Sequence, residues 1–158
     1  MTDSQPSTPA TSLRQAHRDD IPRILEIIEP YVAQRVLIAR DAHDLERLMP
    51  HGFVVESAGE VVGFAAVEIY SSRLGEIQCL AIASSHQRQG LGKQLVEACI
   101  QRAQDEQVWE ILAITSSETF LRSCGFDYSL PDQRRALFLR TGKPADVPAP
   151  APGTPEAS

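Results

Sequence analysis

The sequence predicts an α/β (α+β) fold, in which helices flank a central mixed sheet, and three observations support this. The chain has 158 residues, which is room for one domain of ordinary size. Apolar residues make up 42% and charged residues 23%, the balance of a globular protein with a real core. Strand-like and helix-like patterns alternate in the order β-α-α-β-β-β-α-β-α-β.

The first half of the chain is expected to supply three strands and two helices. A strand at residues 13–16 precedes a helix capped by Asp19 or Asp20, with Pro22 in its first turn. Pro30 is expected to stop this helix, and Asp41 to cap the second one. Strand-like segments at residues 53–56 and 61–70 are joined by Ser-Ala-Gly-Glu, which predicts a β-hairpin.

The second half is expected to supply three more strands, two helices and a tail. Strands are predicted at residues 76–82, 111–115 and 136–140. A long amphipathic helix is predicted at residues 90–107, with Leu91, Leu95, Ala98, Cys99 and Ala103 facing inward. A short helix at residues 118–123 is closed by Gly125. The folded domain is therefore expected at residues 12–140. Residues 1–11 and the Pro/Ala-rich residues 141–158 are expected to be disordered tails.

Composition argues against several classes of function. Three cysteines without a C-x-x-C pair, and four scattered histidines, do not predict a disulfide framework or a metal site. The net charge of -6 argues against general nucleic-acid binding. No apolar run approaches the roughly 18 residues of a membrane span, and the N-terminal residues lack the order of a signal peptide. A cytoplasmic protein without membrane or nucleic-acid partners is expected.

The segment from Cys79 to Gly92 carries the strongest functional signal, an anion site. An apolar strand leads through a polar loop into Gln-x-x-Gly-x-Gly, and a helix begins there. The first amides of a helix lack acceptors and lie at the positive end of its dipole. Glycines at 90 and 92 allow close approach of a phosphate, and Arg88 and Lys93 add charge. The spacing fits neither the dinucleotide fingerprint nor the P-loop.

This loop resembles the Q/R-x-x-G-x-G/A loop of the GNAT superfamily of N-acetyltransferases. Residues 120–126, Phe-Leu-Arg-Ser-Cys-Gly-Phe, resemble the closing F-[YF]-x-x-x-G-F signature of that superfamily. The order of elements over residues 12–140 also agrees, and the resemblance implies a sheet of about six or seven strands. Within the superfamily, residues 37–40, 75–81 and 112–115 resemble the acetyltransferase domain of N-acetylglutamate synthase. The chain would correspond to a short, stand-alone form.

The resemblance implies acetyl-CoA as co-substrate, with no metal. The pantetheine would lie along a strand edge that opens at a bulge, where an amide, taken to be that of Leu80, donates to the thioester carbonyl. The pyrophosphate would lie at the glycine loop. The cofactor-binding residues expected on this basis are Cys79, Leu80, Ala81, Ile82, Gln87, Arg88, Gln89, Gly90, Leu91, Gly92 and Lys93.

Glu76 is the candidate general base, because the resemblance places the base of the synthase near the start of this strand. The alternative is an ordinary solvent-facing carboxylate. The acid that protonates the thiolate is less defined, since Leu121 stands where many GNAT enzymes have tyrosine. Ser116 and Ser117 are the candidate replacements, with Tyr128 as a more distant option.

Arginines are the candidate acceptor ligands. Arg40 lies in a region that forms part of the acceptor pocket in this superfamily, where a guanidinium can clamp an α-carboxylate. Arg134 or Arg135 could hold a second carboxylate. The expected acceptor is thus a small amino acid similar to L-glutamate. Another amine acceptor (a peptide, a polyamine or an antibiotic) and a non-catalytic acetyl-CoA sensor are the alternatives. Homodimers are frequent in the family, and the sequence leaves that question open.

Overall fold

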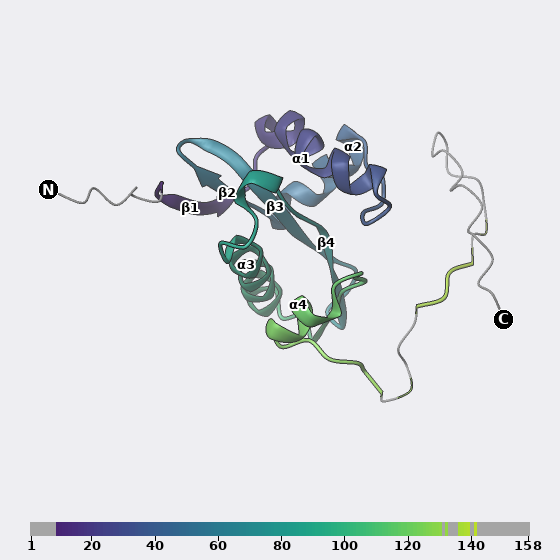
Figure 1. Cartoon of the computed structure of the whole chain (residues 1–158). Coiled ribbons are helices and arrows are strands. Elements are labelled where there is room, and N and C mark those ends of the chain that lie inside the picture. Colours follow the sequence, from purple (N-terminus) through teal and green to yellow (C-terminus); the bar gives the residue numbers. More distant parts are fainter. Residues whose placement is uncertain (1–8, 131, 133–135, 140, 142–158) are drawn as a thin grey trace, which may run out of the picture.

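The computed structural model describes residues 9–130, 132, 136–139 and 141 (Figure 1). Five strands form one sheet: β1 (Thr11–Gln15), β2 (Gly52–Ser57), β3 (Glu60–Ile69), β4 (Leu74–Ile82) and β5 (Glu110–Leu112). The four α-helices of the described residues are α1 (Ile21–Ala33), α2 (Ala42–Leu48), α3 (Leu91–Asp105) and α4 (Glu118–Ser123). Short 3-10 turns η1 (Arg18–Asp20), η2 (Met49–His51) and η3 (Ser84–His86) precede α1, β2 and the glycine loop, respectively.

The strands follow one another in chain order across the sheet, β1-β2-β3-β4-β5. The first four pair antiparallel, whereas β4 and β5 pair in parallel across the α3 crossover. The predicted hairpin is confirmed: Ser57 pairs with Glu60, and Ala58 and Gly59 form its two-residue turn with φ of 51° and 80°. Positive φ at both positions matches the twist that a tight hairpin requires.

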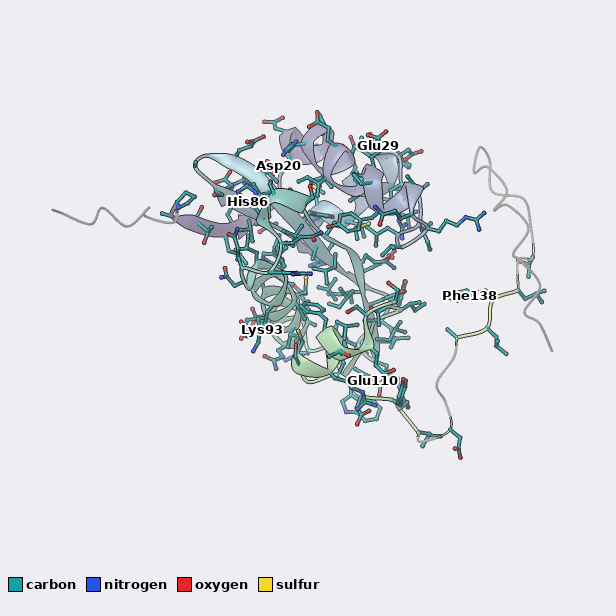
Figure 2. All side chains as sticks on the ribbon, viewed as in Figure 1. Asp20, Glu29, His86, Lys93, Glu110 and Phe138 are labelled. Carbon is teal, nitrogen blue, oxygen red and sulfur yellow. The ribbon has the colours of Figure 1, made fainter. Side chains whose placement is uncertain are left out.

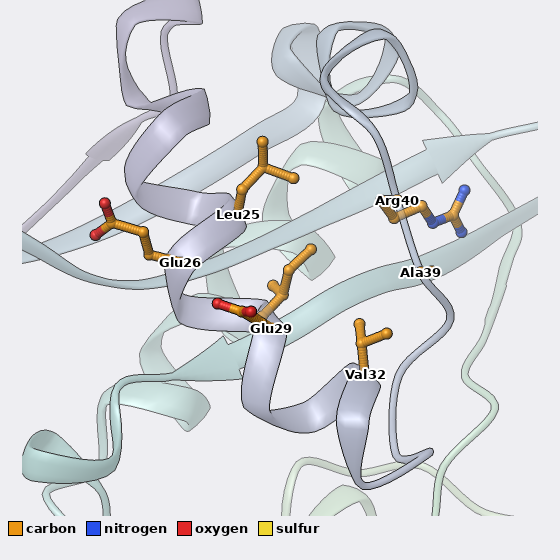
Figure 3. A pocket seen from close by; sticks show the side chains of 7 residues that line it. Leu25, Glu26, Glu29, Val32, Ala39 and Arg40 are labelled. Atoms are coloured by element: carbon orange, nitrogen blue, oxygen red, sulfur yellow. The ribbon is translucent and has the colours of Figure 1, made fainter.

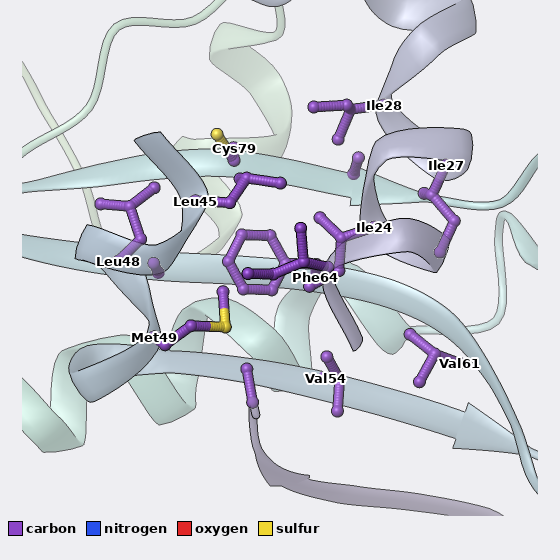
Figure 4. Packing of buried hydrophobic residues seen from close by; sticks show 14 residues of the cluster. Ile24, Ile27, Ile28, Leu45, Leu48, Met49, Val54, Val61, Phe64 and Cys79 are labelled. Carbon is purple, nitrogen blue, oxygen red and sulfur yellow. The ribbon is translucent and has the colours of Figure 1, made fainter. Parts of the chain in front are cut away.

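Helices cover both faces of the sheet (Figure 1). On one face α1 and α2 pack over Phe64, which lies at the centre of a buried cluster with Ile24 and Leu45 (Figure 4). On the other face α3 buries Leu91, Leu95, Cys99 and Ala103, which recur every four residues along one side of the helix. The inward face predicted for α3 is therefore confirmed, although Ala98 is only half-buried.

Two helix boundaries test the proline and capping arguments. Pro22 lies in the first turn of α1, as predicted, but Pro30 does not end the helix, which continues to Ala33. Proline removes one backbone donor, yet its carbonyl still accepts from the Gln34 amide, so the last turn closes. Asp41 caps α2 as predicted, accepting from the Asp44 amide at 2.8 Å.

The C-terminal part of the sheet differs from the expectation. β5 covers three residues rather than 111–115, and residues 136–139 form no strand. The sheet of the described residues has five strands, so the expectation of six or seven was wrong for this part of the chain. Leu137 and Phe138 are 94% and 75% exposed, and Phe138 lies away from the sheet (Figure 2). Without a neighbouring strand, their apolar character alone does not place this segment in the sheet.

Candidate active site

The strand β4 is interrupted by a bulge opposite Ala65. Phe64 pairs with Ala81 and Ala66 pairs with Gln78, so two residues of β4, Cys79 and Leu80, face a single residue of β3. Cys79 has a φ of 56°, a left-handed conformation that is uncommon outside glycine. Gln78 and Cys79 consequently both lie on the face covered by α1 and α2, whereas Leu80 packs on the α3 face.

The second half of β4 has an open edge on the side of β5. The parallel pairing with β5 ends at Glu76 and Leu112. From Ile77 to Ile82, β4 therefore has no strand partner on the β5 side within the described part of the chain. An unpaired edge presents backbone donors and acceptors to an extended ligand. The backbone of Cys79, Leu80, Ala81 and Ile82, which the sequence assigned to the cofactor, lies on this edge.

The helix α3 begins directly after the glycine loop, with Gly90 at its N-cap. Gly90 has a φ of 77° and Arg88 a φ of 61°, and no side chain caps the first amides. A Cβ atom on Gly90 would meet nothing within 4 Å, so open space lies in front of this helix end. His86 precedes the loop, and the exposed Lys93 lies in the first turn of α3 (Figure 2). Uncapped amides, the helix dipole and the cationic side chains of Arg88 and Lys93 are the features that an anion site would need.

The other loop residues contribute in different ways. The side chain of Leu91 is buried in the core, so only its backbone can serve a ligand. A Cβ atom on Gly92 would lie 3.4 Å from the Phe120 ring, so this glycine allows α3 to pack closely against α4. Gln89 is exposed, and Gln87 directs its side-chain amide to the Tyr31 hydroxyl.

Glu76 belongs to a chain of polar side chains beside the open edge. The Tyr70 hydroxyl donates to the Glu76 carboxylate at 2.5 Å and accepts from the Gln78 amide at 3.4 Å. Gln78 in turn accepts from Arg40 at 2.6 Å. Glu68 lies 3.3 Å from the same hydroxyl. Burial, and then the hydrogen bond to Glu76, raises the pKa of Tyr70, so the phenol keeps its proton at neutral pH.

The Arg40 side chain extends away from α1 and toward β4 (Figure 3). Its Nε atom is buried and has no hydrogen-bond partner among the described residues. Burial raises the pKa of the neighbouring Cys79 thiol, and this effect outweighs the positive charge of Arg40, which would lower the pKa. Cys79 is therefore a packed neutral thiol rather than a nucleophile.

Two cavities adjoin this chain of side chains. One, of about 330 Å³, lies between α1 and the segment of Ala39 and Arg40, with Glu29 at its wall (Figure 3). The other, of about 960 Å³, is lined by Glu76, β5, residues 113–115, part of α4 and residues 126–129 and 136–138. Glu76 lines the larger cavity and connects through Tyr70 and Gln78 to Arg40 at the smaller one. A molecule at the open edge would therefore have a carboxylate and a guanidinium on the same side.

The predicted acid residues lie apart from this arrangement. Ser116 and Ser117 are exposed and do not line the larger cavity, and Ser117 stands at the start of α4, where its amide donates to Thr115. Tyr128 does line that cavity, and its hydroxyl donates to Glu118. Leu121 is buried. Arg134 and Arg135 lie outside the described residues.

Sequence reasoning missed Tyr31, Tyr70 and Gln78. Tyr70 and Glu76 stand on either side of the turn between β3 and β4, so the hairpin register was the one available signal for their proximity. The contact of Arg40 with Gln78 spans 38 positions and leaves no local pattern in the sequence.

The described part of the chain lacks two further features. No helix in this part of the chain is long and apolar enough to cross a membrane. Within the same residues, no group of three or more His, Cys, Asp or Glu side chains could hold a metal ion.

The chain is similar to several known proteins. The chain is 30% identical over 142 residues to an amino-acid acetyltransferase of Neisseria meningitidis, covering 86% of this chain and 33% of that protein. It thus spans about a third of the length of this relative.

Two solved structures share the fold and were determined with CoA bound. Rv2747 of Mycobacterium tuberculosis, in complex with CoA and NLQ, has a TM-score of 0.68 and 27% identity over 72% of this chain and 70% of that one. The N-acetylglutamate synthase of Neisseria gonorrhoeae, in complex with CoA and N-acetyl-glutamate, has a TM-score of 0.67 and 29% identity, covering 72% of this chain and 27% of that one. The model of the acetyltransferase (GNAT) family matches residues 12–126. The chain belongs to the acetyltransferase (GNAT) family.

Proposed function

We propose that this protein transfers an acetyl group from acetyl-CoA to the amine of a small amino acid similar to L-glutamate. The observation that carries the proposal is the chain of contacts Glu76–Tyr70–Gln78–Arg40 beside the open edge of β4. It combines a carboxylate and a guanidinium on one side of the edge along which the thioester would lie. The CoA complexes of the two structural relatives support the choice of donor.

The cofactor would be held by backbone groups more than by side chains. The amides at the start of α3, from Gly90 to Gly92, would receive the pyrophosphate, and Arg88 and Lys93 would add positive charge. The pantetheine would follow the edge of β4 from Cys79 to Ile82. At the bulge, the Leu80 amide would stabilise the oxyanion that forms on the thioester carbonyl.

Glu76 would accept the proton that the acceptor ammonium must lose before attack. The neutral amine nitrogen then forms the N–C bond and the C–S bond breaks. The nitrogen loses a second proton, which balances the one that the thiolate takes up. Tyr70 donates a hydrogen bond to Glu76 and remains a protonated phenol at neutral pH, so it would be a candidate proton donor in place of Ser116 and Ser117. The guanidinium of Arg40 would bind the α-carboxylate through N–H groups that Gln78 leaves free.

The test is thiol release from acetyl-CoA against a panel of amino acids and other amines. Turnover with glutamate or a close relative is expected, and Glu76→Gln should lower kcat by about 100-fold or more. Glu60→Gln is the matched control, because its carboxylate is 66% exposed at the start of β3. Turnover restricted to peptides, polyamines or antibiotics would refute the amino-acid acceptor, and an unaffected Glu76→Gln would refute the assigned base.

A non-catalytic acetyl-CoA sensor is the second candidate, favoured by the buried Leu121 at the position of the usual tyrosine. It would bind acetyl-CoA tightly in calorimetry and release no thiol with any amine of the panel. Steady thiol release in the presence of one amine would exclude it.

A further inference from the structure

Tyr31 connects three segments through one oxygen atom. It lies near the end of α1, and its ring packs against the cluster around Phe64. Its hydroxyl donates to the carbonyl of Ile82, the last residue of β4, and accepts from the side-chain amide of Gln87. Gln87 is the first residue of the Gln-x-x-Gly-x-Gly loop. The hydroxyl therefore joins α1 and the end of the open edge to the start of the anion-binding loop.

The direction of the backbone from Gln87 into α3 depends on how firmly Gln87 itself is held in place. The chain before it is tied down by the Ala83 amide, which donates to Val62 at 2.7 Å, and by the His86 amide, which donates to Ala83 at 2.8 Å. Soon after Gln87 come Arg88 and Gly90, which both have left-handed backbone conformations. A small rotation at Gln87 would therefore redirect the amides that follow Gly90.

The backbone of Tyr31 holds the other side of the site. Its carbonyl accepts from the amides of Val36 at 2.8 Å and Leu37 at 3.2 Å, which closes the turn after α1. This turn, in which Arg35 has a φ of 60°, leads to Arg40 at the smaller cavity. One residue thus anchors the loop beside the cofactor with its side chain and the segment beside the acceptor with its backbone.

We propose that Tyr31 is a positioning residue for the pyrophosphate loop, acting through Gln87. The hydroxyl fixes the Gln87 side chain, so the loop holds the shape that receives the pyrophosphate before the cofactor arrives. A loop that is already ordered loses less conformational entropy on binding, and the benefit is confined to ligands that reach the loop. This inference rests on the proposed use of acetyl-CoA.

The test compares CoA with pantetheine, which lacks the pyrophosphate, in calorimetric titrations and competition at millimolar pantetheine. Tyr31→Phe removes the hydroxyl and keeps the ring packed. We expect the Kd for CoA to rise about tenfold and the Kd for pantetheine to stay within about twofold. The KM for acetyl-CoA should rise by a similar factor with kcat little changed.

A double-mutant cycle separates the hydroxyl contact from general damage. Gln87→Ala should weaken CoA binding as Tyr31→Phe does, and the double variant should be no weaker than either one. Gln101→Ala is the matched control, because it removes an exposed side-chain amide that donates to Asp105 at 2.9 Å within α3, and its Kd for CoA should not change. Additive losses, or a Tyr31→Phe variant that weakens CoA and pantetheine equally, would overturn the proposal. If the unmodified protein bound no CoA, the proposed function itself would fail, whereas normal CoA binding by Tyr31→Phe would refute this inference alone.

Discussion

Arg40 shows how a single side chain acquires a defined position from the strand opposite to it. The bulge at Cys79 turns two successive residues of β4 toward α1 and α2, and one of them, Gln78, accepts a hydrogen bond from the Arg40 guanidinium. Because the Arg40 Nε is buried without a partner among the described residues, its desolvation is not compensated within this part of the chain. A carboxylate in the adjoining cavity would supply a partner to the guanidinium.

Arg40→Ala should raise the KM for the amino-acid acceptor by about 10- to 100-fold, the equivalent of one lost charge-assisted hydrogen-bond pair. The KM for acetyl-CoA should change less than about twofold, because the glycine loop and the edge of β4 remain intact. Steady-state kinetics with each substrate varied in turn makes the measurement. Arg18→Ala is the control, since Arg18 is 76% exposed and lies 3.8 Å from Glu46 in a surface ion pair. A rise in the KM for acetyl-CoA alone would remove Arg40 from the acceptor site.

At the scale of elements, local patterns predicted the parts that local physics determines. The cap of α2, the hairpin between β2 and β3 and the inward face of α3 each follow from a few neighbouring residues, and all three are confirmed. The predictions that the helix ends at Pro30 and that residues 136–139 belong to a strand were wrong for the opposite reason. Whether a helix survives an internal proline, or an apolar segment finds a sheet edge, depends on contacts with distant parts of the chain.

The start of α3 gives a prediction with a matched control. Gly90 and Gly59 both have positive φ, 77° and 80°, and a Cβ atom on either would meet nothing within 4 Å. Gly90→Glu and Gly59→Glu should therefore carry a similar backbone cost, about 1–2 kcal/mol. Gly90→Glu, but not Gly59→Glu, should abolish CoA binding in calorimetry, because only Gly90→Glu places a carboxylate in front of the proposed anion site. Undiminished CoA binding by Gly90→Glu would show that the pyrophosphate lies elsewhere.

At the scale of the whole molecule, the site is assembled from segments that only the complete fold brings together. Glu76 and the glycine loop could be selected from the sequence because they fall in one continuous stretch with a family pattern. Tyr31 meets Gln87 across 56 positions, and Arg14 of β1 meets Glu56 of β2 across 42. Contacts of that range depend on register and on bulges such as that at Cys79, which residue patterns alone do not specify.

The Arg14 cluster ties the edge strand β1 to the start of α1, and it gives the fold an acid-sensitive component. Arg14 donates to both oxygens of Asp20, at 2.8 and 2.9 Å, and to Glu56 at 2.6 Å. The hydrogen bond from Arg14 lowers the pKa of Asp20, although burial opposes the shift. A carboxyl whose pKa is lowered in the folded state stabilises the fold at every pH above the pKa that it has in the unfolded chain, near 3.9. This stabilisation is lost as the pH falls through the pKa of the folded state.

Asp20→Asn should therefore destabilise the protein at pH 7 by about 1–3 kcal/mol, because it removes one partner from a half-buried Arg14. The difference from the unmodified protein should shrink as the pH falls below about 4, where the unfolded chain takes up a proton on Asp20. It should vanish only below the lowered pKa of Asp20 in the folded state. Urea unfolding at a series of pH values measures both effects. Asp127→Asn provides the comparison, since Asp127 is 69% exposed and pairs with Arg122 at 3.0 Å, so its effect at pH 7 should stay below about 1 kcal/mol. A destabilisation by Asp20→Asn that is constant from pH 7 to below pH 4 would mean that packing, and not the charge of Asp20, holds β1 to α1.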